Sequence, residues 1–355
     1  MAFTTINKST DYFNTKLYTG TGATLNITGL DFQPDFSWLK VRSNADNHAL
    51  FDAVRGATKR LASNLTAVES NRATALTSFN SDGFTLGDNS ETNTNNYTYA
   101  SWNWLGANGT AANTDGDIAS TVSANTTSGF SIVSYTGNGT SGATVGHGLS
   151  SKPGMMIFKE RNGTTSWVVY HHKNTSAPAT EYLQLNSSNA TGDYAGYFND
   201  TEPTSSVFTL GNDTGINQSG DTYIAYCFAE KQGYSKFGSY VGNGSADGTF
   251  VYTGFKPAFV ISKCINIANN WVMTDTKRST YNITANWLGC NVSDAEGAYT
   301  YYDILSNGFK ARNTSGWINS GDASLTTDGN TPTYIYMAFA EAPLVGTNNI
   351  PANAR

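Results

Sequence analysis

An apolar run that begins after a proline and ends in lysine occurs three times along the chain. The runs occupy 34–40, 153–159 and 257–263, and lysine stands at the sixth position after the proline in each of them. Short runs rich in aromatic and branched residues, bounded by turn formers, predict β-strands. Their recurrence at long intervals predicts a repeated architecture.

A longer aromatic segment closes each copy of this pattern. These segments are 97–102, 222–230 and 333–341. In the last one, Tyr334 and Tyr336 alternate with Ile335 and Met337, so both faces of the predicted strand are apolar or aromatic. We therefore expect each closing segment to be a strand inside a two-sheet sandwich.

A third recurring segment follows each proline run, at 48–55, 167–174 and 271–278. The first and third copies keep an aspartate and an arginine three residues apart, and the second copy has other residues in the same frame. The pairs are Asp52/Arg55, Asp275/Arg278 and, in the second copy, His171/Asn174. Because the frame recurs within one chain, we predict structural ion pairs at the first and third copies in preference to a ligand clamp.

The proline landmarks lie 119 and 104 residues apart, which is the size of small domains. We predict an all-β protein of tandem antiparallel β-sandwich repeats. The expected divisions are an N-terminal segment 1–10, sandwich repeats 11–107, 129–230 and 233–342, a connector 108–128 and a C-terminal tail 343–355.

Composition supports this class and excludes others. Charged residues make up 14% of the 355 residues, against roughly 25% in average proteins. With 13% aromatics and a net charge of −6, the chain is neither a disordered polyelectrolyte nor a basic nucleic-acid binder. The abundance of Asn, Thr, Ser and Gly disfavours long helices. We expect no membrane insertion, because no apolar stretch approaches the roughly 20 residues of a span, and no secretory signal is visible at the N-terminus.

The three cysteines, Cys227, Cys264 and Cys290, form no CxxC motif. We expect free thiols buried as small hydrophobes, as in a protein folded in a reducing cytosol. A disulfide between Cys264 and Cys290 is the alternative.

Several motifs resemble those of a family of bacteriophage virion proteins with repeated concanavalin-A-like or laminin-G-like jelly-roll domains, labelled mainly as tail-fibre or structural proteins of marine phages. The matching residues are Phe32 to Phe36, Asp52 to Gly56, Gly129 to Gly137, Gly146 to Leu149, Gly220 to Tyr226 and Phe250 to Pro257. The resemblance covers nearly the whole chain. It implies a virion component assembled in the host bacterial cytoplasm, with other virion proteins as partners and, by analogy with phage fibres, a homotrimer.

Catalytic chemistry finds little support in the sequence. Retaining glycosidases need two carboxyl groups about 5–5.5 Å apart, which alternate residues of a strand can supply. The candidate pairs are Asp115/Asp117, Asp200/Glu202 and Asp294/Glu296. All lie among turn-forming residues, so we predict that the protein is not an enzyme.

Metal binding has equally weak signals. His147 lies between glycines, as a structural loop residue would, and the adjacent His171 and His172 would point to opposite faces of a strand. Residues 113–117 resemble the start of a calcium loop, but Ile118 and Ala124 replace its glycine and distal acid. We predict no metal and no cofactor.

Aromatic residues are the remaining candidates for binding chemistry, because sugars stack on aromatic faces. Trp102 and Trp104 would share one strand face, as would Tyr97 and Tyr99. We consider these four as glycan-binding candidates, with core or interface packing as the favoured interpretation of each.

The resemblance, together with the lack of catalytic signals, predicts a non-enzymatic virion structural protein exposed on the particle. It would be a tail fibre, appendage or capsid-surface subunit that binds a glycan or the host surface. A purely architectural capsid-decoration or tail-assembly protein is the first alternative. A polysaccharide depolymerase is the second.

Overall fold

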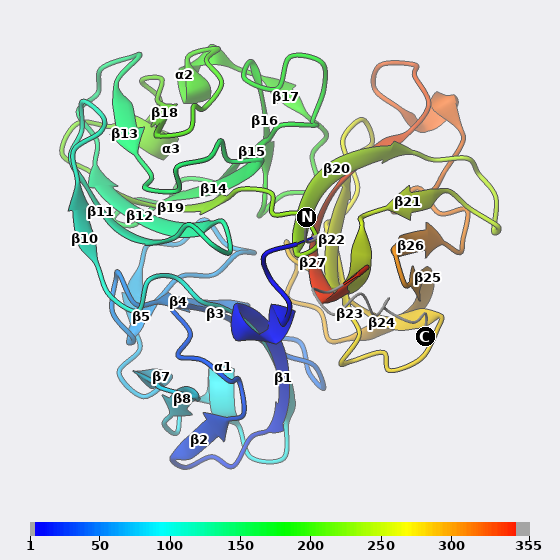
Figure 1. The fold of residues 1–355 in the computed structure, drawn as a ribbon, viewed down its shortest axis with the longest axis horizontal. Helices are drawn as coiled ribbons and strands as arrows, with labels where there is room; N and C mark the ends of the chain where they lie inside the picture. Colours follow the sequence, from blue (N-terminus) through cyan, green and yellow to red (C-terminus); the bar gives the residue numbers. More distant parts are fainter. Residues whose placement is uncertain (1–3, 346–355) are drawn as a thin grey trace.

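The computed structural model describes residues 4–345, and within them all paired strands run antiparallel. Three β-sandwich lobes surround a common centre (Figure 1). The blue lobe is repeat 1, the cyan and green lobe is repeat 2, and the yellow to red lobe is repeat 3. The all-β sandwich class predicted from the hydrophobic pattern is confirmed.

Repeat 1 is built from a four-stranded sheet, β1-β9-β3-β4, and a three-stranded sheet, β2-β8-β7, with a short β5-β6 ribbon beside them. Its elements are η1 (Ser9–Asp11), β1 (Phe13–Thr19), β2 (Leu25–Thr28), β3 (Phe36–Val41), β4 (Ala49–Asp52), β5 (Lys59–Arg60), β6 (Ser70–Asn71), β7 (Leu76–Asn80), β8 (Gly83–Leu86), α1 (Ser90–Asn93) and β9 (Thr98–Trp104).

Repeat 2 has an eight-stranded sheet, β10-β11-β12-β19-β14-β15-β16-β17, faced by the β13-β18 pair. Its elements are β10 (Ala111–Asn113), β11 (Ser120–Asn125), β12 (Phe130–Thr136), β13 (Thr144–Gly146), β14 (Met155–Glu160), β15 (Val168–His171), β16 (Glu181–Gln184), β17 (Gly192–Asp193), α2 (Ala195–Phe198), β18 (Val207–Thr209), α3 (Thr214–Asn217) and β19 (Thr222–Phe228).

Repeat 3 is one eight-stranded sheet, β20-β27-β22-β23-β24-β25-β26-β21, whose later strands form the second layer of the sandwich. Its elements are β20 (Ser235–Val241), β21 (Phe250–Tyr252), β22 (Phe255–Cys264), β23 (Val272–Asp275), β24 (Thr284–Gly289), β25 (Gly297–Leu305), β26 (Gly308–Ala311), η2 (Ala323–Leu325) and β27 (Thr333–Pro343).

The segment expected to be a connector between repeats 1 and 2 is part of the second sandwich. Its residues 111–113 and 120–125 form β10 and β11, and β11 pairs along the outer edge of β12. Composition misled the prediction because small and polar residues such as those of Ser120–Asn125 suit an edge strand that is only half-buried. Repeat 2 therefore begins at about residue 111.

The same four strands form the inner sheet of every repeat. They are arranged β1-β9-β3-β4 in repeat 1, β12-β19-β14-β15 in repeat 2 and β20-β27-β22-β23 in repeat 3. One face of each inner sheet contributes to a single central hydrophobic core that contains residues of all three repeats. The opposite face covers the core of its own sandwich.

This arrangement explains why the closing strands are apolar on both faces. In β27, Ile335, Met337 and Phe339 enter the central core. Their neighbours Tyr334 and Tyr336 enter the core of sandwich 3. The three sandwiches thus share one core and are not independent globules, which the repeat pattern by itself does not indicate.

The chain ends differ in how far the structure describes them. In the N-terminal segment, Ile6 belongs to the central core and the Thr4 hydroxyl donates to the Gln232 carbonyl, so this segment joins repeat 1 to the start of repeat 3. Of the predicted C-terminal tail, residue 343 lies in β27, and 346–355 lie outside the described residues.

The lysines that end the proline runs, Lys40, Lys159 and Lys263, are all buried. Each ammonium group donates to the carbonyl of the next residue, at 2.9, 2.8 and 2.6 Å, and to further loop carbonyls. Burial lowers the pKa of each lysine to about 8. The recurring lysine therefore satisfies turn carbonyls at the end of each inner strand. The three cysteines are free and buried, as expected, and no disulfide joins Cys264 to Cys290.

Candidate functional site

Buried charges hold repeat 1 against repeat 2. Asp52 pairs with Arg55, and Arg55 also contacts Glu69 at 3.1 Å. Across the boundary, Arg161 of repeat 2 binds Glu69 at 3.0 Å, and the Tyr226 hydroxyl donates to Asp52 at 2.8 Å. Four charges are thereby paired and hydrogen-bonded, as burial of ionised groups requires.

The boundary between repeats 3 and 1 repeats this network residue by residue. Asp275 pairs with Arg278, and Arg278 contacts Glu296 at 3.1 Å. Arg42 of repeat 1 binds Glu296 at 2.7 Å, and the Trp102 indole N–H donates to Asp275 at 3.1 Å. The Asp/Arg frame noted in the sequence is therefore an intramolecular ion pair at both places, extended into the neighbouring repeat.

The boundary between repeats 2 and 3 lacks these charges. The five equivalent positions hold His171, Asn174, Thr191, Ile265 and Met337. The sequence frame gives the first two equivalences and the strand register gives the fifth. The third and fourth follow from one backbone hydrogen bond, which runs from Glu69 N–H to the Arg161 carbonyl at 2.7 Å, from Glu296 to Arg42 at 2.9 Å and from Thr191 to Ile265 at 2.7 Å. None of the five positions at this boundary holds Asp, Glu, Lys or Arg, so no charge is buried there without its partner.

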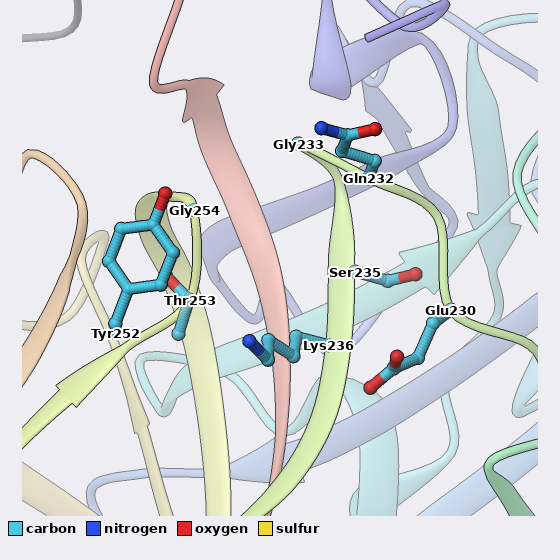
Figure 2. A pocket seen from close by; sticks show the side chains of 8 residues that line it. All are labelled: Glu230, Gln232, Gly233, Ser235, Lys236, Tyr252, Thr253 and Gly254. Atoms are coloured by element: carbon cyan, nitrogen blue, oxygen red, sulfur yellow. The ribbon is translucent and has the colours of Figure 1, made fainter. Parts of the chain in front are cut away.

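A groove runs along the rim of this uncharged boundary, and we call it the repeat 2–3 groove. One part has a volume of about 540 Å³ and is lined from both repeats, by residues that include His172, Lys173 and Phe250. An adjoining part of about 370 Å³ is shown in Figure 2. The two parts share Glu230, Lys236 and Tyr252 in their linings, so they form a continuous depression.

An aromatic wall lines the repeat 3 side of the groove. Phe250 and Tyr252 are two residues apart on β21, which places them on the same face of the strand. Their exposed fractions are 45% and 48%, which is high for residues of this size. The Lys236 ammonium lies 5.6 Å from the centroid of the Tyr252 ring, and Figure 2 shows it pointing toward that ring from β20.

A polar wall lies opposite, formed by the edge strand β20 of repeat 3 together with Glu230 and His172 of repeat 2. The backbone N–H of Phe237 donates to a Glu230 carboxylate oxygen at 2.9 Å. The His172 Nε2–H donates to the Phe237 carbonyl at 2.6 Å, and His172 lies 3.8 Å from Glu230. These two side chains of repeat 2 satisfy the outward backbone groups of Phe237 in place of a further strand, and so they cover this part of the β20 edge. The polar atoms of this wall are consequently held in position.

Three of the four aromatic residues proposed as glycan-binding candidates belong to the interior. Trp102 and Trp104 lie in the central core, and Tyr99 is fully buried. The Tyr99 hydroxyl accepts the Thr94 N–H at 2.9 Å. A buried ring cannot stack on a sugar. A glycan-binding role is therefore wrong for these three residues, and the packing interpretation holds. Tyr97 is half-buried, and its hydroxyl accepts from Asn44 at 3.4 Å.

The candidate catalytic carboxylates are dispersed and engaged elsewhere. Asp117 accepts from Thr144, Glu202 pairs with Lys152, and Glu296 belongs to the boundary network. Among residues 4–345, no cluster of three His, Cys, Asp or Glu side chains is suited to hold a metal ion. The imidazole of His147 is buried, with a pKa lowered to about 4 by desolvation, as suits a structural loop residue.

Sequence reasoning missed Phe250 and Tyr252. The sequence gives little indication of their role, because Phe250-Val251-Tyr252 is a strand of three residues in which only the central Val251 is buried. A strand whose outward positions are both aromatic is unusual enough to notice. What the sequence does not show is that β20 and Glu230 lie opposite these rings.

The chain belongs to the family described as "Domain of unknown function (DUF7483)", whose model matches residues 8–343 and so spans all three repeats. Comparison with curated proteins and with solved structures found no match. In the described part of the chain, no helix has the length and apolar character needed to cross a membrane.

Proposed function

We propose that this protein is a non-enzymatic carbohydrate-binding protein whose ligand lies in the repeat 2–3 groove. The observation that carries the proposal is the pair of half-exposed rings, Phe250 and Tyr252, on one face of β21. In a chain that buries most of its Trp, Tyr and Phe side chains, two adjacent exposed rings lining a groove need an explanation.

The chemistry of the groove suits a sugar. Pyranose rings present apolar C–H faces, which pack on aromatic rings, and hydroxyl groups around their edges, which need hydrogen-bonding partners. The aromatic wall supplies the first requirement. Ser239, Lys173 and Glu230 supply donors and acceptors for the second. The groove is open at the surface, which suits a polymer chain better than a small enclosed ligand.

The number of carboxylates in the groove favours binding over hydrolysis. Within the described residues, the lining contains one carboxylate, that of Glu230. A retaining or inverting glycosidase of the ordinary kind needs two flanking the scissile bond. The depolymerase alternative therefore has weaker support than a binding role.

The resemblance to phage virion proteins supports a place on the surface of a virus particle, as part of a tail fibre, an appendage or the capsid surface. There the groove would contact glycans of the host surface. A purely architectural role is the alternative, and in it Phe250 and Tyr252 would contact another virion protein and not a glycan. Immunogold labelling of intact particles tests the location, and the absence of label on them would contradict it.

The binding role is tested by Tyr252→Ala, with Tyr299→Ala as the matched control. Both tyrosines are exposed on repeat 3, at 48% and 55%, but Tyr299 lies on β25 outside the groove. Because a stacked ring contributes about 1–3 kcal/mol in comparable aromatic contacts, we expect Tyr252→Ala to weaken binding to purified host polysaccharide by at least about fivefold. Tyr299→Ala should bind as the unaltered protein does.

Unfolding temperatures of both variants are measured alongside, to separate binding from folding. Equal affinities of the two variants would contradict the proposal. So would a failure of the unaltered protein to bind any polysaccharide of the host surface. Release of oligosaccharides from the polymer would instead favour the depolymerase.

A further inference from the structure

Positive charge gathers in the repeat 2–3 groove, although the chain as a whole has a net charge of −6. Lys173 enters from the turn after β15, and Lys236 enters from β20. The groove's one carboxylate among the described residues, Glu230, already accepts the Phe237 N–H. The lining thus has two ammonium groups for one partly engaged carboxylate.

Many cationic side chains of the described residues are held by carboxylates or carbonyls, and these two lysines are not. Arg42, Arg55, Arg161 and Arg278 are held in the boundary networks. Other cations, such as Lys152, pair with a carboxylate at the surface. In the part of the chain that the structure describes, Lys173 and Lys236 have no carboxylate within 4.0 Å. Their charges are therefore free to meet a ligand.

Lys236 is also placed where it would matter for a stacked sugar. Its ammonium lies 5.6 Å from the centroid of the Tyr252 ring, so a ring stacked on Tyr252 would have this charge at its border. An acidic substituent on such a sugar would lie beside the ammonium. A neutral sugar would leave the ammonium unpaired when the groove is covered, which costs free energy.

We infer that the repeat 2–3 groove selects an acidic polysaccharide, one whose sugar rings carry carboxylate or sulfate groups. This inference rests on the proposed carbohydrate-binding function and specifies its ligand class. The aromatic wall provides stacking common to all sugars, and Lys173 and Lys236 provide the preference for the negatively charged ones. Since the contacts lie at the surface, the preference weakens as salt screens it, with a Debye length of about 8 Å at 0.15 M.

The test compares each acidic polymer with its own neutral form. A polyuronate is paired with its carboxyl-reduced derivative, and a sulfated polysaccharide with its desulfated derivative. Binding to the full-length protein is measured by calorimetry at low and high salt. We expect at least one acidic polymer to bind about fivefold or more tightly than its neutral form at low salt, and the difference to shrink at high salt. The arm that binds identifies carboxylate or sulfate as the recognised group.

Variants assign the preference to the groove. Lys173→Gln and Lys236→Gln should each reduce the acidic preference several-fold. Lys277→Gln is the matched control, because Lys277 follows β23 as Lys173 follows β15, is exposed, and lies outside the groove. Glu230→Gln, which keeps an acceptor for the Phe237 N–H, should tighten binding of the acidic polymer by about two- to fivefold.

The possible outcomes separate this inference from the function on which it rests. If neutral and acidic forms bind equally and Tyr252→Ala abolishes both, carbohydrate binding stands and the acidic preference is overturned. If Lys277→Gln weakens binding as much as the groove variants do, the charge effect is nonspecific and the inference is again overturned. If no polymer binds, the proposed function itself fails.

Discussion

His48 occupies a position that the other two repeats fill with tryptophan, and one hydrogen bond is kept at all three. The His48 ring donates from Nε2 to the Gly289 carbonyl at 3.0 Å. Trp167 and Trp271 donate from their indole nitrogens to carbonyls of the adjacent repeat, at 2.8 and 3.0 Å. Trp38 fills the volume left by the smaller histidine, where the other repeats have isoleucine, and its own N–H donates to His48 Nδ1.

The neutral state of His48 predicts sensitivity to acid. Burial lowers its pKa to about 3 from an ordinary value of 6.5, and the Nδ1 that would take a proton already accepts from Trp38. Between pH 6.5 and 3 the unfolded chain binds a proton at this site and the folded chain does not. Stability contributed by neutral His48 is therefore full above pH 6.5 and is lost as pH falls, by up to about 1.4 kcal/mol per pH unit.

The change that tests this is His48→Gln, followed by urea unfolding between pH 4 and 7. Glutamine can keep both a donor and an acceptor but does not titrate, so the variant should lose less stability on acidification than the unaltered protein. His171, whose pKa is also lowered to about 3 by burial, titrates in both proteins and provides the shared background. Parallel pH profiles for the two proteins would contradict the assignment.

At the scale of elements, the boundaries between inner sheets differ in how they are held together. Arg55 has its side chain fully buried between Asp52 and Glu69. Asn174, at the equivalent position of repeat 2, accepts one hydrogen bond from Thr191 at 2.8 Å. Two boundaries thus depend on complete charge networks and the third on neutral packing.

This difference predicts unequal costs for the same kind of change. Arg55→Ala leaves Asp52 and Glu69 buried without their cation, so we expect a loss of about 3–5 kcal/mol in the free energy of unfolding. Asn174→Ala removes one neutral hydrogen bond and should cost about 1 kcal/mol. Denaturant unfolding of both variants measures the difference, and equal losses would show that Asp52 and Glu69 do not depend on Arg55 to compensate their charges.

At the scale of the whole molecule, the three repeats pack around one central core. Trp104 is at the middle of it, with aromatic rings of every repeat around it at centroid distances between 4.9 and 6.4 Å. These rings are Phe13 and Phe36 of repeat 1, Phe130 and Phe228 of repeat 2, and Phe259 and Phe339 of repeat 3. An isolated repeat would expose the face of its inner sheet that now enters this core.

A substitution in the central core should therefore lower the stability of all three repeats. Trp104→Ala is expected to lower the free energy of unfolding by about 3–5 kcal/mol while unfolding remains a single transition. Hydrogen exchange should report faster global opening in the inner strands β9, β19 and β27 alike. A loss of protection confined to repeat 1 would show instead that the sandwiches unfold independently.

Much of the fold follows from local pattern. The proline runs and the closing aromatic segments lie in strands, as predicted, because alternation and turn residues act over a few positions. The Asp/Arg frames form ion pairs, as predicted, but their place at the repeat boundaries was not. The strands β10 and β11 escaped notice, because Ala111–Asn113 and Ser120–Asn125 carry little apolar signal and gain their stability from pairing with β12. The binding candidates were misassigned for a related reason, since Trp102 looks the same in sequence whether it faces solvent or a shared core.

The sequence by itself determined the class of structure and its threefold repetition, since both depend on residues close together in the chain. Only the tertiary structure decided that the three sandwiches share one core, because that depends on which sheet faces meet. It also decided where a ligand can bind. Phe250 and Tyr252 acquire their meaning from Glu230, Lys173 and Lys236, which come from other strands and turns and meet them at the boundary of two repeats.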